Sequence, residues 1–210
     1  MSLQGMLGKQ GAKVVKNGAW KEHPICAMTL GICSALAISN MVANAVAMSA
    51  GVIFVLVLTA VVISSLRKLI PTRVRIITYM ITIASGVIIV DRVLQAYFPP
   101  ISAALGPYVG LIITNCIIMG RAEGFYAQNE LKYSVLDALA NGFAYTYTLI
   151  SIAIVREVLG FGTFLGYQVM PKESFVTWSV MAAPAGAFFL LGIFLWITRT
   201  LANIRPPGKG

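Results

Sequence analysis

The hydrophobic positions of this chain fall into long runs that are separated by short polar segments. Residues 25–66 contain no Asp, Glu, Lys or Arg. A membrane-spanning helix needs about 20 apolar residues, so a run of this length predicts two spans. The polar residues Ser39, Asn40 and Asn44 mark the predicted break. The first span, residues 25–39, is too short to cross a ~30 Å hydrocarbon core as one straight helix, which predicts a broken helix.

Five further spans follow from the same pattern. They are predicted over residues 45–66, 76–98, 101–120, 138–155 and 174–198, with Pro99 and Pro100 between the third and the fourth. Proline interrupts helices, so Pro184 together with Gly186 predicts a kink in the sixth span. We therefore expect an all-α integral membrane protein with six transmembrane helices.

The basic residues of the chain predict its orientation in the membrane. The sequence is 58% hydrophobic and only 11% charged, whereas soluble domains average about 25% charged residues. The net charge is +9, and the charged residues lie in short segments between apolar runs. This distribution argues against a nucleic-acid partner. All of the 16 lysines and arginines except Arg92, Arg156 and Lys172 fall on one side of the six-span arrangement. The positive-inside rule then places both termini in the cytoplasm.

The six spans divide into two sets of three. Because three is an odd number, a repeated second set would be inverted in the membrane relative to the first. We expect a basic cytoplasmic segment over residues 1–24, a first inverted repeat over residues 25–98, a second over residues 101–199 and a cytoplasmic tail over residues 200–210. The first helix of each repeat, spans one and four, is expected to be broken. Cys33 and Cys116 occupy these two helices, and the inversion predicts that they meet near the middle of the membrane.

The segment over residues 111–126 combines a cysteine with charged residues at the end of an apolar run. Asn115 precedes Cys116, and Arg121 and Glu123 follow it closely. Ionisable residues at membrane depth are costly and usually mark function. Either span four is broken near Thr114 and Asn115, or Arg121 lies inside the membrane. Arg121 and Glu123 either pair to complete a buried turn or mark the cytoplasmic end of the span.

The cysteines suggest iron ligation. Thiolates are the soft ligands of iron–sulfur clusters, although buried cysteines also occur as small hydrophobic residues. A cluster usually takes four cysteines, and this chain has three. Cys26 lies about 10 Å from Cys33 along a helix, so we assign it to packing. Two ligands would then come from a partner subunit with the same inverted arrangement.

Several motifs resemble one family of respiratory membrane proteins. The segments TNCIIMGRAE, GICSALAIS, VRIITYMITIAS and REVLGFGTFLG are similar to the D subunit of the sodium-translocating NADH:quinone oxidoreductase. The resemblance covers nearly all of residues 20–200. The TNC-x3-GRAE motif also occurs in the E subunit of that complex and in the paralogous subunits of the Rnf complex. Ser34, directly after Cys33, resembles the quinone reductase version, because the Rnf counterpart more often has proline there.

The resemblance implies a role in electron transfer. Cys33 and Cys116 would bind a [2Fe-2S] cluster together with two cysteines of a homologous sister chain, which is of the E type and of opposite topology. Asn115, Arg121 and Glu123 would support the cluster segment. The cluster would relay electrons across the bacterial inner membrane to a covalent flavin, coupled to export of sodium ions. Flavins, NADH and quinone are expected only in other subunits, so this chain alone carries no catalytic residues and no complete active site.

Other functions remain open from the sequence. The chain could be the E subunit of the related Rnf ferredoxin:NAD oxidoreductase complex. It could also be a non-redox transporter subunit built from inverted repeats, in which Arg121 and Glu123 bind a substrate, or a purely structural subunit. Asp91, Asp137 and Glu157 either line a sodium path or are solvated at the membrane interface. Bound iron would separate the redox function from the others.

Overall fold

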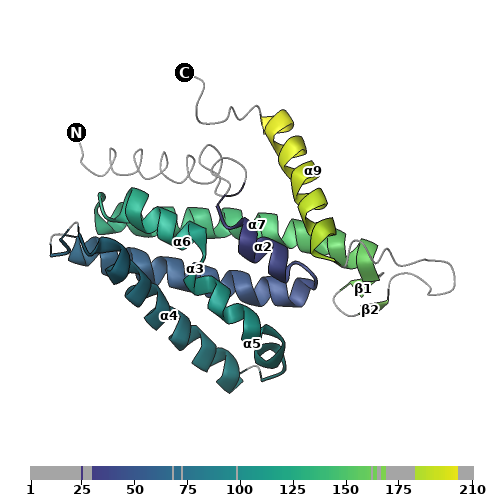
Figure 1. Ribbon diagram of the computed structural model, residues 1–210, viewed down its shortest axis with the longest axis horizontal. Helices are drawn as coiled ribbons and strands as arrows, with labels where there is room; N and C mark the ends of the chain where they lie inside the picture. Colours follow the sequence, from purple (N-terminus) through teal and green to yellow (C-terminus); the bar gives the residue numbers. More distant parts are fainter. Residues whose placement is uncertain are drawn as a thin grey trace, which may run out of the picture.

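A computed structural model describes Ile25 and residues 30–67, 69–71, 73–97, 99–161, 163–164, 167–168 and 183–202. The described chain is almost entirely helical (Figure 1). The elements are α2 (Ile32–Ile38), α3 (Val42–Leu66), α4 (Arg75–Tyr97), α5 (Pro99–Ile113), α6 (Cys116–Arg121), the π-helix η2 (Ala122–Tyr126), α7 (Leu131–Phe161) and α9 (Pro184–Ala202). Two-residue strands, β1 (Thr163–Phe164) and β2 (Tyr167–Gln168), pair antiparallel after α7.

Three of the described helices are long and apolar enough to cross a bilayer. They are Val42–Leu66, Arg75–Tyr97 and Leu131–Gly160, with mean hydropathies of 2.8, 1.7 and 1.5. At the helical rise, the 25 residues of α3 extend about 37 Å, more than the ~30 Å hydrocarbon core. A shorter apolar stretch, Ala185–Thr198, lies within α9. An all-helical membrane protein is therefore confirmed, while six spans in two inverted repeats stay a prediction.

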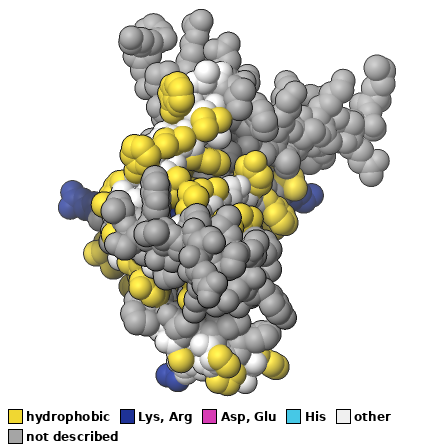
Figure 2. All heavy atoms as spheres, turned by 90° about the vertical axis from the view of Figure 1, so that its right-hand side faces the viewer, with side chains coloured by type: hydrophobic (Ala, Val, Ile, Leu, Met, Phe, Trp, Pro, Cys, Tyr) yellow, Lys and Arg dark blue, Asp and Glu magenta, His cyan; other side chains and the backbone are white. Residues whose placement is uncertain are grey.

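The outer surface of the helices carries many large apolar side chains. Phe54, Ile81, Phe143 and Trp196 are between 45% and 71% exposed, whereas the hydroxyl-bearing Thr59 of α3 is fully buried. A soluble protein rarely exposes apolar patches of this extent. Figure 2 shows hydrophobic side chains over most of the described part of one face, with Lys and Arg at its margins. This distribution fits helices that are surrounded by lipid.

The longest packing interface joins α3 to α7, which run side by side (Figure 1). Gly142 of α7 permits their close approach, because a Cβ at this position would lie 2.9 Å from Cγ1 of Ile53. Small residues are typical of such contacts between membrane helices. Helices α4 and α5 also pack against α3, and α9 contacts α7 and α2. The α3–α7 pair therefore forms the centre on which the shorter helices rest.

Two predicted helix breaks are present. Helix α2 ends at Ile38 and α3 begins at Val42, which confirms the break at Ser39 and Asn40. Helix α5 ends at Ile113 and α6 begins at Cys116, so the fourth predicted span is broken at Thr114 and Asn115. The π-helix that follows α6 widens the turn toward α7. Of the two sequence-based alternatives for this segment, the broken helix is confirmed.

Two predictions about helix boundaries are wrong. The sequence predicts that the fifth span begins after Asp137 and ends before Arg156, but α7 runs from Leu131 to Phe161 and contains both residues. Charges mark span ends when water solvates them, whereas these two find partners within the protein. Helix α9 begins at Pro184, and the kink predicted at this residue depends on residues 174–182, so it stays a prediction. Proline is well accommodated at the first position of a helix, where its missing N–H has no partner in any case. The predicted span residues 174–182 lie outside the described residues.

A polar cluster lies at each end of the bundle, and the one around Arg156 and Glu157 is described with the candidate site below. At one end, Arg67 donates to the carbonyl of Gln128 at 3.3 Å, and Arg75 pairs with Glu123 at 3.1 Å. These contacts join the loop between α3 and α4 to the segment between α6 and α7. The predicted topology requires both segments on the same side of the membrane. The side that faces the cytoplasm, like the predicted domain boundaries, stays a prediction.

Candidate functional site

The two cysteines singled out by the sequence lie together. Cys33 is in the first turn of α2, directly after the left-handed turn at Gly31, and Cys116 is the first residue of α6, directly after the break at Thr114 and Asn115. Their thiols are close enough to interact electrostatically. Both cysteines are free and exposed on the surface of the chain. The structure therefore brings Cys33 and Cys116 together, while their position near the middle of the membrane stays a prediction.

A buried polar cluster joins the backbones that carry the two cysteines. Asn115 donates from Nδ2 to Oγ of Ser34 at 3.2 Å, and Ser34 shares a 2.8 Å hydrogen bond with the hydroxyl of Tyr145. All three side chains are fully buried. Ser34 also donates to the carbonyl of Gly31 at 3.1 Å. Because serine has one hydroxyl proton, Tyr145 is then the donor to Ser34.

Asn115 performs a second task at the start of α6. Its Oδ1 accepts a hydrogen bond from the backbone N–H of Ile117 at 3.1 Å, which caps the helix that begins with Cys116. Asparagine is among the preferred capping residues because its short side chain reaches the first free N–H groups. One side chain therefore fixes the direction of α6 and ties it to α2 through Ser34.

Gly31 allows α2 to begin where it does. Its φ angle is 79°, in the left-handed region that glycine adopts without steric cost. A Cβ on Gly31 would lie 2.6 Å from Cδ1 of Ile117 and 3.3 Å from Cε2 of Tyr145. The residue thus serves both the turn into α2 and the close approach of α2 to α6.

The thiol pair is the strongest candidate for metal ligation, but it is incomplete. In the described part of the chain, no group of three or more His, Cys, Asp or Glu side chains could hold a metal ion. Two neighbouring, exposed sulfurs fit half of the four-thiolate set of a [2Fe-2S] cluster. Cys26 lies outside the described residues, so its exclusion as a ligand stays a prediction.

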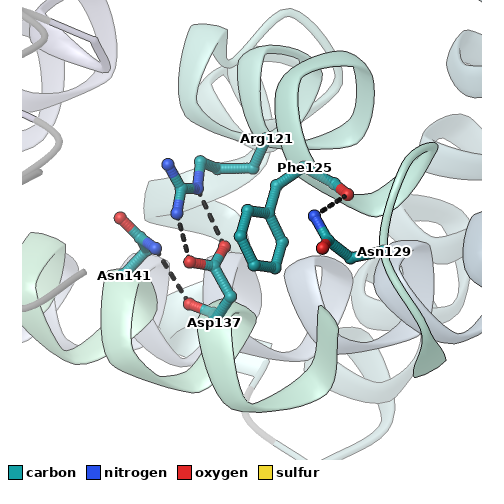
Figure 3. Close-up of polar contacts among 5 residues, drawn as sticks. All are labelled: Arg121, Phe125, Asn129, Asp137 and Asn141. Carbon is teal, nitrogen blue, oxygen red and sulfur yellow. Dashed lines mark hydrogen bonds and ion pairs between the residues drawn. The ribbon is translucent and has the colours of Figure 1, made fainter. Parts of the chain in front are cut away.

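Arg121 and Asp137 form an ion pair deep in the bundle (Figure 3). Arg121 donates through Nε to Oδ2 of Asp137 at 2.8 Å and through a terminal nitrogen to Oδ1. The side chains are 6% and 1% exposed. The Arg121 guanidinium also lies 5.2 Å from the ring centre of Phe125, and Asn141 donates to the backbone carbonyl of Asp137. This bidentate pair anchors the end of α6 to α7.

The charged residues near Cys116 thus have partners on other helices. Arg121 pairs with Asp137 on α7, and Glu123 pairs with Arg75 on α4. The sequence leaves open whether Arg121 and Glu123 pair with each other. It also favours interfacial solvation for Asp137, which is wrong because this carboxylate is 1% exposed. The signal that could have identified the partner of Arg121 was an aspartate directly before the next predicted helix.

Arg156 and Glu157 support the break between α2 and α3 at the other end of the bundle. Arg156 donates to the carbonyl of Leu36 at 3.1 Å and to Oγ of Ser39 at 2.6 Å. Glu157 accepts from the backbone N–H of Val42, the first residue of α3, at 2.7 Å. Glu157 is 3% exposed, so its predicted interfacial solvation is also wrong.

Asp91 is half-buried and accepts from Gln95 at 2.8 Å. A sodium path along these carboxylates stays a prediction.

Tyr145 and Arg156 are the contributors that the sequence did not single out. Tyr145 lies in an apolar run, where an aromatic residue is usual. Arg156 follows such a run, and a charge at that point is typical of a span end. The hydroxyl of Tyr145 and the charge of Arg156 were the available signals, because buried polar groups need hydrogen-bond partners.

These features define a membrane protein with several spans, in which two broken helices present a pair of thiols. The chain belongs to the Rnf-Nqr family, since the family model described as "Rnf-Nqr subunit, membrane protein" matches residues 12–195. Similar proteins are named as the D subunit of the Na(+)-translocating NADH-quinone reductase. The protein of Pseudoalteromonas atlantica is 41% identical over 197 residues, which cover 92% of this chain and 94% of the relative. The protein of Shewanella sp. (strain ANA-3) is 39% identical over 206 residues, which cover 96% and 98%.

Proposed function

We propose that this chain is a membrane subunit of a sodium-translocating NADH:quinone reductase and that it provides half of a shared [2Fe-2S] site. The first part is supported by the names of relatives that align over nearly the whole chain. The second part rests on one observation, the proximity of Cys33 and Cys116, each of which lies at the start of a short helix. Two cysteines that only filled space would not need to interact across the two halves of the chain.

The missing ligands point to a second chain. A [2Fe-2S] cluster takes four cysteines, and the described residues bring together two. Because both sulfurs lie on the surface of the chain, a neighbouring protein has access to them. We propose a homologous sister chain of the E type that presents its own pair from the opposite orientation. Iron would neutralise much of the charge of four thiolates placed in a membrane.

The order of helices supports inverted repeats within this chain. In each half, a short helix with a cysteine in its first turn comes before a long apolar helix: α2 and α3 in the first half, α6 and α7 in the second. Two such units of three spans each would have opposite orientations. We propose six spans, with both termini in the cytoplasm and the protein in the bacterial inner membrane.

The roles of individual residues follow from their contacts. Cys33 and Cys116 would hold iron, and the bound cluster would supply one-electron transfer across the membrane, coupled to sodium export. Ser34, Asn115 and Tyr145 keep the two cysteine-bearing backbones at a fixed separation. Arg121 holds α6 against α7 through Asp137. NADH, quinone and flavins would bind other subunits.

Two other functions are less well supported. The Rnf-Nqr family also includes Rnf proteins, but the similar proteins from Pseudoalteromonas and Shewanella carry the quinone reductase name. A transporter in which Arg121 binds a substrate would need that guanidinium to face a cavity. In the structure, two of its nitrogens are directed at the carboxylate of Asp137.

Iron and EPR analysis of the purified complex tests the proposal. We expect a [2Fe-2S] signal that is lost in Cys33→Ala and in Cys116→Ala, while Cys26→Ala serves as the control and retains it. The complex should assemble with its other subunits in the control. A full signal in Cys116→Ala would refute the ligand assignment. A complete cluster in the chain expressed without its sister chain would refute the shared site.

A further inference from the structure

A small basic pocket lies at the end of the bundle where α3 ends and α4 begins. Its volume is about 110 Å³, and it is lined by Ile63, Arg67, Ile70, Arg75, Tyr79 and Ala127. The lining combines two guanidinium groups and a tyrosine with aliphatic walls. A pocket of this size accommodates a group such as a phosphate, but not a whole lipid or a helix.

The charges around this pocket leave one arginine uncompensated. Arg75 pairs with Glu123 at 3.1 Å, and Tyr79 also interacts with these two side chains. Arg67 donates to the carbonyl of Gln128, a neutral acceptor, and forms no ion pair with any residue that the structure describes. The three ionic groups Arg67, Arg75 and Glu123 thus carry a net charge of +1. A singly charged anion would balance this charge.

Exposed apolar residues flank the pocket. Leu69 is 77% exposed, and Ile76 and Ile77, which follow Arg75, are 57% and 62% exposed. In a membrane protein such residues contact acyl chains. A guanidinium pocket beside a lipid-facing apolar surface matches the two parts of an anionic phospholipid, the headgroup phosphate and the chains. Basic pockets between membrane helices bind lipid headgroups in this way.

We propose that Arg67 and Arg75 bind the phosphate of an anionic phospholipid, whose acyl chains lie along the exposed surface of α4. The lipid supplies the missing negative charge from the bilayer itself. Only its phosphate needs to enter the pocket of about 110 Å³, because the rest of the lipid stays outside. Because the pocket also contacts the segment that leads into α7, the bound phosphate would join α3, α4 and that segment. This site does not depend on the thiol pair.

Photoactivatable lipids test this site in native membranes that contain the full tagged chain. We expect photoactivatable phosphatidylglycerol to label residues 63–79 more strongly than photoactivatable phosphatidylcholine. Each arginine near a membrane surface contributes about 1 kcal/mol to binding of anionic lipid, so Arg67→Gln should lower specific labelling about fivefold. The double variant Arg67→Gln, Arg75→Gln should lose the preference for the anionic lipid. The matched control is Arg73→Gln with Lys132→Gln, which removes two charges at the same end without changing the pocket lining.

Three outcomes would overturn the proposal. One is equal labelling by the two lipids in the unmodified chain, and another is an unchanged preference in the double variant. The third is protection from labelling by inorganic phosphate as effective as protection by unlabelled phosphatidylglycerol, because the pocket would then take a free anion. The recovery of tagged chain from the membrane reports folding, and Arg67→Gln alone leaves the Arg75–Glu123 pair in place.

Discussion

Ser34 and Tyr145, which belong to different halves of the chain, share a 2.8 Å hydrogen bond between two fully buried hydroxyl groups. Ser34 directly follows Cys33, and Asn115, which donates to Ser34, directly precedes Cys116. The geometry of the thiol pair is therefore coupled to a single buried contact with α7.

Tyr145→Phe should loosen the thiol pair without opening a cavity. The change removes one hydrogen bond, worth about 1 kcal/mol, and retains the ring. We expect a shifted midpoint potential and a broadened EPR signal of the cluster, because the separation of the two sulfurs becomes less well defined. The control is Tyr147→Phe, since Tyr147 is 67% exposed. Equal effects of the two substitutions would argue against a positioning role for Tyr145.

Gly31→Ala should displace α2 from α6. The new Cβ would meet Ile117 at 2.6 Å in a backbone conformation that alanine adopts at a cost of about 1–2 kcal/mol. We expect lower iron content per complex, measured by elemental analysis. Gly110→Ala is the control, because nothing lies within 4 Å of its added Cβ. Full iron content in Gly31→Ala would show that the close approach of α2 and α6 is not required for the site.

Asp137→Asn should destabilise the chain strongly, since it leaves the charge of Arg121 buried without its carboxylate. Breaking a buried ion pair costs about 3–5 kcal/mol. We expect a lower thermal unfolding temperature of the purified complex and less chain in the membrane. Replacing both partners, as Arg121→Met with Asp137→Leu, should recover part of the loss. Asp91→Asn, at a half-buried residue, is the control. A double variant as unstable as Asp137→Asn would contradict this account.

Two exposed positions at opposite ends of the bundle test the orientation. Leu69 and Tyr97 are 77% and 75% exposed, at the start and the end of the segment that contains α4. With both termini in the cytoplasm, an impermeant thiol reagent should label Tyr97→Cys in intact spheroplasts. It should label Leu69→Cys only after the membrane is opened. The reverse pattern would overturn the proposed topology.

The sequence predicted the helix breaks because polar residues interrupt apolar runs at Asn40 and at Asn115. It predicted the thiol pair because the proposed inverted repeats would place the two cysteines at equivalent positions. It misplaced both ends of the fifth span because Asp137 and Arg156 were counted as water-facing. Hydropathy cannot distinguish a solvated charge from one that is neutralised on another helix, and that difference depends on tertiary contacts such as Arg121–Asp137.

The position of the two cysteines also sets a time order for assembly of the protein. Cys33 leaves the ribosome long before Cys116, and Tyr145, which orients the neighbour of Cys33, is made later still. The contact between Ser34 and Tyr145 therefore cannot form until α7 has been made and packed. Delivery of the proposed cluster would then follow the packing of α7, and a chain stalled before Cys116 would offer the assembly machinery one isolated thiol.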